Sequence, residues 1–149
     1  MNMISDGHGD YCDLTLHKSK NSMEKWNLGY GCYHDSYDFY TNSSTGSSAI
    51  SAIEPSYVDA DRLYVATDDG TFFYSNNGGT SWDKTASFTG PGEYYLYGAT
   101  IFASRTISDL VYFGGSGYSN DPVWKSIDGG ETFTSMSAGL PSLLVHEIV

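Results

Sequence analysis

Basic residues are scarce in this chain, and their scarcity excludes several classes of partner. The 149 residues include 7 Lys and Arg against 18 Asp and Glu, a formal net charge of -11. So acidic a chain repels phosphate backbones and anionic lipid surfaces, and we expect no nucleic-acid partner. No run approaches the roughly 20 apolar residues that a membrane span needs, so no span is predicted. The first ten residues also lack the basic and apolar regions of a signal peptide.

Aliphatic residues and helical patterns are also scarce. Leu, Ile, Val and Phe together number 29, and so low a share combined with high net charge is typical of disordered chains. However, 13 Tyr, 7 Phe and 3 Trp supply apolar area that a disordered chain lacks. No long stretch keeps apolar residues at helical spacing, and 17 Gly interrupt the chain often. The composition therefore predicts a folded, turn-rich β protein.

Only two cysteines are present, Cys12 and Cys32, and they do not form a CxxC motif. Two cysteines are too few for a disulfide scaffold. The sequence leaves two alternatives open, a single disulfide in an oxidising compartment or two unpaired buried thiols.

Short runs of β-forming residues alternate with turn residues through most of the chain. Strands this short at such regular spacing are typical of an all-β sandwich, barrel or propeller. The eight predicted strands are residues 48–53, 62–67, 71–75, 81–85, 97–103, 110–114, 123–126 and 132–136.

An eight-residue motif, here called the octet, recurs and favours a repeat architecture. The octets at 75–82 (SNNGGTSW) and 126–133 (SIDGGETF) lie 51 residues apart, and each follows a strand of similar sequence. A degenerate copy at 19–26 keeps Ser19, Asn21 and Trp26, but has Met23 and Lys25 where the other copies have glycine and a hydroxyl residue. Three copies with four short strands per unit are the pattern of propeller blades.

The octet has a physical interpretation as a hairpin turn. Its glycine pair permits positive φ angles, which other residues resist. The Asn or Asp side chain two positions after the serine can accept hydrogen bonds from backbone N–H groups inside the turn. The terminal Trp or Phe then re-enters the sheet as a large apolar anchor. The octet is therefore predicted to join the third strand of each unit to the fourth.

The pattern S-x-[DN]-x-G-x-[TS]-[WF] resembles the Asp-box, or BNR, repeat of bacterial sialidases, xyloglucanase-type glycoside hydrolases and the sortilin-type receptor domain. The resemblance implies a β-propeller of four-stranded antiparallel blades. The residues 138–142 (AGLPS) are similar to those of secreted BNR-repeat proteins of bacteria, which implies an extracellular or cell-surface location. The matching residues are Ser75, Asn77, Gly79, Ser81, Trp82, Ser126, Asp128, Gly130, Thr132 and Phe133.

On this interpretation the chain holds about two full blades with a part-blade at each end. Residues 48–89 and 90–142 form the two blades, 1–47 the end of a degenerate blade and its connecting loop, and 143–149 the first strand of a further blade. Because propellers remove open edges by closing a ring, we expect the remaining blades in a longer chain. The alternative is that several copies of this chain assemble into a ring.

No catalytic residue and no cofactor are predicted. The resemblance implies three arginines around a sialidase substrate carboxylate, and this chain has only Arg62 and Arg105. A pair of carboxylates for glycoside hydrolysis is not marked by any motif. The loop carboxylates are therefore interpreted as solvated turn residues: Asp35, Asp38, Asp59, Asp61, Asp68, Asp69, Glu93 and Asp121.

The sequence offers one candidate for a metal site. Asp6, His8 and Asp10 place two carboxylates and an imidazole within five loop residues, a donor set that suits a cation. The favoured interpretation is a polar connection before the first strand, without a metal.

Clustered aromatic residues are the candidate ligand-binding residues. Tyr94, Tyr95 and Tyr97 precede a strand, while Tyr118 and Trp124 flank an insertion in the last blade. Aromatic rings with a polar tip suit the apolar faces and hydroxyl rims of sugars. The alternative is that these rings pack between neighbouring blades. We therefore expect a carbohydrate- or protein-binding module, and the runner-up is part of a xyloglucanase-like hydrolase whose carboxylates lie in other blades.

Overall fold

The computed structural model describes residues 15–18, 26–29, 37–86, 88, 90–91, 100–118 and 120–149. The chain divides into two compact units, Met1–Asp38 and Phe39–Val149. The first unit contains an antiparallel pair, β1 (Thr15–Lys18) and β2 (Trp26–Gly29). Trp26 of the degenerate octet pairs with Lys18, while Ser19 and Asn21 lie outside the described residues.

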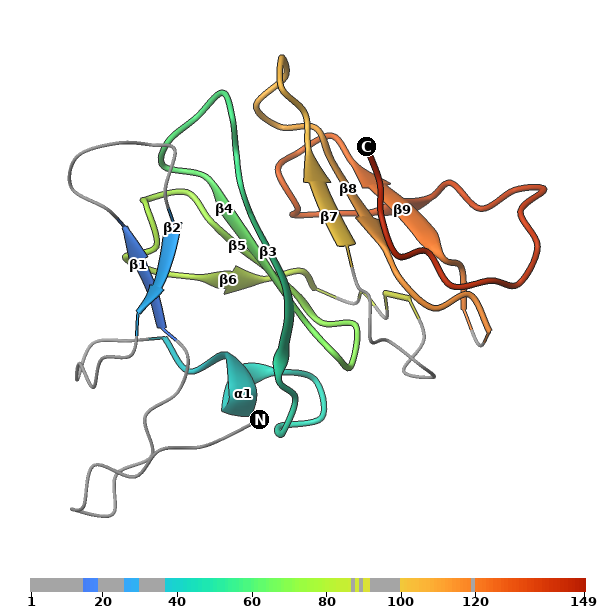
Figure 1. Cartoon of the computed structure of the whole chain (residues 1–149), viewed down its shortest axis with the longest axis horizontal. Helices are drawn as coiled ribbons and strands as arrows, with labels where there is room; N and C mark the ends of the chain where they lie inside the picture. The colour runs from blue at the N-terminus through green and yellow to red at the C-terminus, as the bar shows by residue number, and fades with distance from the viewer. Residues whose placement is uncertain are drawn as a thin grey trace. The chain divides into compact units, whose positions relative to one another are not determined.

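The second unit consists of two four-stranded antiparallel sheets (Figure 1). In each sheet the strands lie side by side in the order in which they occur in the chain. The first sheet contains β3 (Ile50–Pro55), β4 (Leu63–Thr67), β5 (Phe72–Ser75) and β6 (Asp83–Lys84). The second contains β7 (Thr100–Ala103), β8 (Val111–Gly114), β9 (Val123–Ser126) and β10 (Thr134–Ser135).

Each of the eight predicted strands overlaps one observed strand, and β9 has the predicted bounds. The one described helix is a single turn, α1 (Phe39–Asn42), in the segment that leads into the first sheet. The prediction of an all-β protein with four-stranded antiparallel sheets is therefore confirmed. Agreement is good because turn residues mark both ends of nearly every strand.

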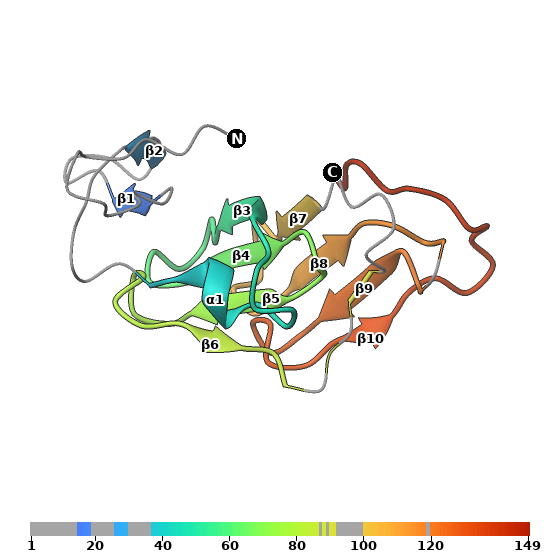
Figure 2. The same cartoon turned by 90° about the horizontal axis from the view of Figure 1, so that it is seen from below.

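The two sheets pack face to face around a shared core. Side chains alternate between the faces of a strand, so Tyr64, Ala66 and Phe72 of the first sheet point toward the second. They meet buried residues of β7 and β8, namely Ile101, Ala103, Val111 and Phe113. Figure 2 shows β7 and β8 beside β3 and β4. The first strands of the sheets, β3 and β7, are neighbours. Burial of these side chains is the main contribution to the stability of the second unit.

The opposite face of the first sheet is covered as well. Val65 and Phe73 are fully buried there, although they point away from the second sheet. The ring of Phe39 packs edge-to-face on Phe73 and on Trp82, at centroid distances of 5.2 and 4.9 Å. The strand β4 is therefore buried on both faces, which explains why its sequence (LYVAT) lacks charged residues.

The C-terminal residues 143–149, predicted to begin another strand, form a single β-bridge rather than an assigned strand. Leu144 pairs with Ser116, and hydrogen bonds link Gly117 N–H to the Leu143 carbonyl and Val145 N–H to the Gly115 carbonyl. Val145 and Ile148 lie against Gly114, where a Cβ atom would come within about 3 Å of both side chains. This segment thus covers part of the second sheet.

Candidate functional site

The second octet forms a turn closed by the side chains of Ser126 and Asp128. The Ser126 hydroxyl donates to Asp128 Oδ1 at 2.6 Å and accepts from the Gly130 N–H at 2.8 Å. Asp128 Oδ1 also accepts from the Thr132 N–H at 2.9 Å, and Oδ2 accepts from the Thr132 hydroxyl. Within this network, the bond from Gly130 satisfies a buried backbone donor that would otherwise lack a partner. It carries the chain from β9 into β10.

The first octet has the same pattern of hydrogen bonds, except that the direction of one bond is reversed. Asn77 Oδ1 accepts from the Ser75 hydroxyl and from the Ser81 N–H, both at 2.9 Å. Its amide nitrogen then donates to the Ser81 hydroxyl at 2.7 Å, whereas the Asp128 carboxylate accepts from Thr132. A hydroxyl can donate or accept, so Asn and Asp close the same turn with different partners.

The ionisation of Asp128 is tied to the turn. Burial alone would raise the pKa of Asp128, but the hydrogen bonds from Ser126 and Thr132 outweigh this effect and hold the pKa below its usual range. The first octet carries no charge at the equivalent position, because an amide occupies it. The two turns share a geometry but only the second depends on an ionised group.

The second octet also packs directly against the first sheet. Its glycines have φ angles of 74° at Gly129 and 95° at Gly130. A Cβ atom at Gly129 would lie 1.5 Å from Nη1 of Arg62, and one at Gly130 would lie 2.8 Å from the Phe72 ring. The Thr85 hydroxyl donates to the Gly130 carbonyl at 2.6 Å. Glycine is therefore needed here for close approach as well as for positive φ.

Arg62 connects the sheets at the same place. Its guanidinium lies 2.8 Å from the Asp109 carboxylate, in the loop between β7 and β8, and 3.7 Å from that of Asp59. The Asp109 carbonyl accepts a hydrogen bond from the Gly129 N–H at 2.8 Å, as the Asp61 carbonyl does from the Gly78 N–H. Both octets therefore donate a glycine N–H to an aspartate carbonyl of the same sheet. At the second octet, Arg62 adds an ion pair that links this contact to the first sheet.

A pair of aromatic triads repeats with the octets. Phe39 contacts Phe73 and Trp82 in the first sheet, and Phe88 contacts Trp124 at 5.1 Å and Phe133 at 4.6 Å in the second. In each triad one ring comes from the segment that precedes the first strand of the sheet, one from the third strand and one from the end of the octet. The rings that precede the first strands, Phe39 and Phe88, were not predicted from the sequence.

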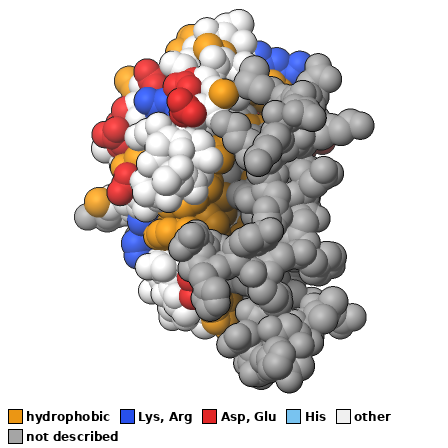
Figure 3. All heavy atoms as spheres, turned by 90° about the vertical axis from the view of Figure 1, so that its left-hand side faces the viewer, with side chains coloured by type: hydrophobic (Ala, Val, Ile, Leu, Met, Phe, Trp, Pro, Cys, Tyr) orange, Lys and Arg blue, Asp and Glu red, His pale blue; other side chains and the backbone are white. Residues whose placement is uncertain are grey.

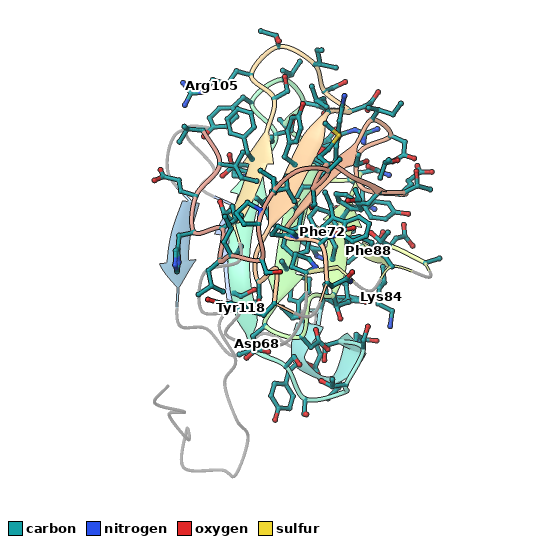
Figure 4. All side chains as sticks on the ribbon, turned by 90° about the vertical axis from the view of Figure 1, so that its right-hand side faces the viewer. Asp68, Phe72, Lys84, Phe88, Arg105 and Tyr118 are labelled. Carbon is teal, nitrogen blue, oxygen red and sulfur yellow. The ribbon has the colours of Figure 1, made fainter. Side chains whose placement is uncertain are left out.

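The candidate ligand-binding rings have different environments. Trp124 is half-buried, packs edge-to-face on Phe88 and donates its indole N–H to the Asp121 carbonyl at 2.8 Å. Tyr118 is 57 % exposed, in the loop between β8 and β9. Figure 4 shows Tyr118 and Asp68 at the end of the sheets opposite Arg105. Tyr94, Tyr95 and Tyr97 lie outside the described residues.

Asp69 differs from a solvated turn carboxylate. Its Oδ1 accepts hydrogen bonds from the hydroxyls of Thr67 and Thr71, both at 2.7 Å, and from the Thr71 N–H. Its Oδ2 accepts from the N–H and the hydroxyl of Thr45. Burial opposes ionisation, but these bonds prevail and hold the pKa of Asp69 far below its usual range. A carboxylate so fully occupied stabilises the turn and is unsuited to proton transfer.

Glu54 was not among the carboxylates considered from the sequence, because it lies within β3 rather than in a loop. Burial raises its pKa, although hydrogen bonds from the Tyr57 side chain and the Ala103 backbone, and the charge of Arg105, act in the opposite direction. The Arg105 guanidinium lies 5.2 Å from the centre of the Tyr57 ring. These residues join the β3–β4 loop to the second sheet.

Two kinds of feature, a cluster of metal-ligating side chains and a membrane-spanning helix, do not occur in the part of the chain that the structure describes. No three His, Cys, Asp or Glu side chains gather there as a metal site would require. Among the same residues, no helix has the length and apolar character needed to cross a bilayer. Asp6, His8 and Asp10, and both cysteines, lie outside the described residues.

Comparison with known proteins assigns no family. A scan against models of protein families gives no match, and a search of curated proteins gives none either.

Proposed function

We propose that the chain is a segment of an Asp-box β-propeller in a secreted, bacterial-type protein, and that it acts as a carbohydrate- or protein-binding module without a complete active site. The observation that carries the proposal is the repetition of one plan. Both sheets have four antiparallel strands in sequence order, and both close the third strand onto the fourth with the same octet network. Sheets that repeat face to face in this way are the building plan of propellers.

The ligand is proposed to bind at the end of the sheets that carries Tyr118. Its exposed ring lies in the long β8–β9 loop, at the end of the sheets opposite Arg105 (Figure 4). A loop on a sheet scaffold is a common place for binding residues. An exposed tyrosine offers a flat apolar face and a hydroxyl, which together suit a sugar ring. Trp124, packed on Phe88, donates its indole N–H to the carbonyl of Asp121 in the same loop.

Retention on immobilised polysaccharides tests this proposal. Tyr118→Ala is expected to weaken retention on xyloglucan or chitin about tenfold, the effect of losing one stacked ring worth roughly 1.4 kcal/mol. Tyr57→Ala is the matched control, because Tyr57 is comparably exposed but lies at the opposite end. Far-UV circular dichroism checks that both variants fold. Equal retention of Tyr118→Ala and wild type would contradict the assignment.

The alternative, part of a glycoside hydrolase, has one observation in its favour. Burial raises the pKa of Glu54, and a raised pKa is the property that a general acid requires. A hydrolase also needs a second carboxylate across a cleft. Release of new reducing ends from xyloglucan by this chain, and its loss in Glu54→Gln, would favour the hydrolase over the binding module.

A further inference from the structure

The loops and turns at one end of the sheets form a continuous surface, here called the octet end. It comprises the β3–β4 loop (56–62), the β7–β8 loop (104–110) and the turns of the two octets. The contacts described above hold these parts together: Arg62 with Asp109, Tyr57 with Arg105, and the Gly78 and Gly129 amides on the neighbouring loops. The Tyr64 hydroxyl adds a bond to the Ser108 carbonyl at 3.3 Å. Both long loops lie at the top of Figure 1.

Large apolar side chains on this surface are exposed to solvent. Tyr57, Val58 and Ile107 are 53, 48 and 54 % exposed, and Ile127, in the second octet, is 73 % exposed. Single exposed apolar residues need no explanation, but several on adjoining loops are typical of interaction sites. Tyr57 is also held in place by Glu54 and Arg105, so its ring is preorganised rather than free to fold away.

Carboxylates lie on the same loops and octet as these apolar residues. Asp59, Asp61 and Asp109 lie on the loops, and Asp128 and Glu131 lie in the second octet. Figure 3 shows acidic side chains gathered in the upper part of the described surface, with hydrophobic side chains among them. Two arginines belong to the same surface, but Arg62 is mostly buried between Asp59 and Asp109, and Arg105 lies over Tyr57. The octet end is therefore apolar with an excess of negative charge.

We propose that the octet end docks a protein segment in which lysine or arginine residues alternate with apolar side chains. The apolar side chains would cover Tyr57, Val58, Ile107 and Ile127, and the cations would pair with the surrounding carboxylates. A second copy of this chain suits the surface poorly, because each copy carries a net charge of -11. This inference goes beyond the proposed function, since it concerns the end of the sheets opposite Tyr118.

Nuclear magnetic resonance of the full chain tests the proposal with three synthetic peptides. The first alternates lysine and leucine, the second has glutamate in place of lysine, and the third has serine in place of leucine. Only the first is expected to shift the backbone resonances, and the shifts are expected in residues 56–62, 104–110 and 127–131. Its affinity is expected to fall as salt is raised, because exposed charges are screened. Binding of the glutamate peptide with equal affinity would overturn the charge argument.

Paired variants locate the site. Val58→Ser with Ile107→Ser is expected to weaken the lysine–leucine peptide about tenfold. Met136→Ser with Leu140→Ser is the matched control, because these residues are comparably exposed outside the octet end. If the first pair impairs folding, Asp61→Asn with Glu131→Gln removes two charges from exposed positions and is expected to weaken binding several-fold and to lessen its salt dependence. Equal losses in the test and control pairs would overturn the proposal.

The two proposals can fail separately. Tyr118→Ala is expected to leave peptide affinity unchanged while weakening polysaccharide retention. Loss of peptide binding in Tyr118→Ala, with shifts confined to the β8–β9 loop, would overturn docking at the octet end and leave the proposed function standing. Polysaccharide retention that is lost in Val58→Ser with Ile107→Ser but kept in Tyr118→Ala would overturn the proposed ligand-binding end, while peptide affinity in the same variants decides docking at the octet end.

Discussion

The Arg62 guanidinium lies 2.8 Å from the Asp109 carboxylate and joins the first sheet to the second. Both side chains are partly exposed, so we expect the pair to contribute modestly, about 0.5–1 kcal/mol. A double-mutant cycle with Arg62→Leu and Asp109→Asn measures this coupling free energy by urea unfolding. Leucine is a suitable replacement because Leu110 occupies the equivalent position of the second repeat. A coupling near zero would show that this ion pair does not help to hold the two sheets together.

Gly129 is expected to tolerate alanine far less well than Gly139. Both residues have positive φ, 74° and 82°, so alanine at either position costs about 1–2 kcal/mol of backbone strain. Only at Gly129 does the added Cβ atom collide with Arg62, since nothing lies within 4 Å at Gly139. Thermal unfolding should therefore show the larger loss for Gly129→Ala. The difference should shrink in an Arg62→Ala background, and its persistence there would point to another cause.

Asp128→Ala should lower the free energy of unfolding by about 1–3 kcal/mol, because the turn loses the hydrogen bonds that the charged carboxylate accepts from Ser126 and Thr132. Asp128→Asn combined with Thr132→Ser should cost much less, since the first octet makes the same network with Asn77 and Ser81. Urea unfolding of both variants checks the prediction. Equal destabilisation would mean that the carboxylate has a role beyond hydrogen bonding in the turn.

Phe39→Ala should destabilise the chain by about 3–5 kcal/mol, because its buried ring contacts both Phe73 and Trp82. The adjacent Tyr40 is exposed, so Tyr40→Ala is a matched control and should change stability by less than about 0.5 kcal/mol. Thermal melting followed by circular dichroism distinguishes the two. Similar melting temperatures for both variants would contradict the expectation that the Phe39 ring stabilises the core of the second unit.

Acid should destabilise the turn that contains Asp69. Its pKa is lower in the folded chain than in the unfolded chain, so its contribution is complete above the unfolded pKa, near 4. That contribution declines as the pH falls from about 5 toward the folded pKa. Asp69→Asn should therefore be less stable at pH 7 and lose less stability between pH 5 and pH 2. Parallel pH profiles for the variant and wild type would contradict this role.

The strands and the octets were predictable because their signals are local. The residues 75–82 and 126–133 contain the turn chemistry that closes each hairpin, and flanking strands are short and bounded by glycine, serine or aspartate. Phe39 and Phe88 were not predictable, because each partners rings more than thirty residues away and no motif marks them. Glu54 was missed for a similar reason, since its burial depends on how the sheets pack. The sequence drew attention to Arg62 only in the count of arginines that a sialidase site needs. Its contact with Gly129 could not be predicted, because the two residues are brought together by the packing of the sheets.

The contact between Arg62 and Gly129 makes the two repeats unequal, because only the first repeat contributes an arginine to the next one. Arg62 precedes β4 and extends forward to the Asp109–Gly129 contact, whose counterpart in the first sheet joins Asp61 to Gly78. The second repeat has Leu110 in the place of Arg62, so it cannot form the equivalent ion pair with a following repeat. A tandem of two first repeats would keep the ion pair, whereas a tandem of two second repeats would lose it. The order in which the first repeat precedes the second therefore allows an ion pair that the reverse order would lack.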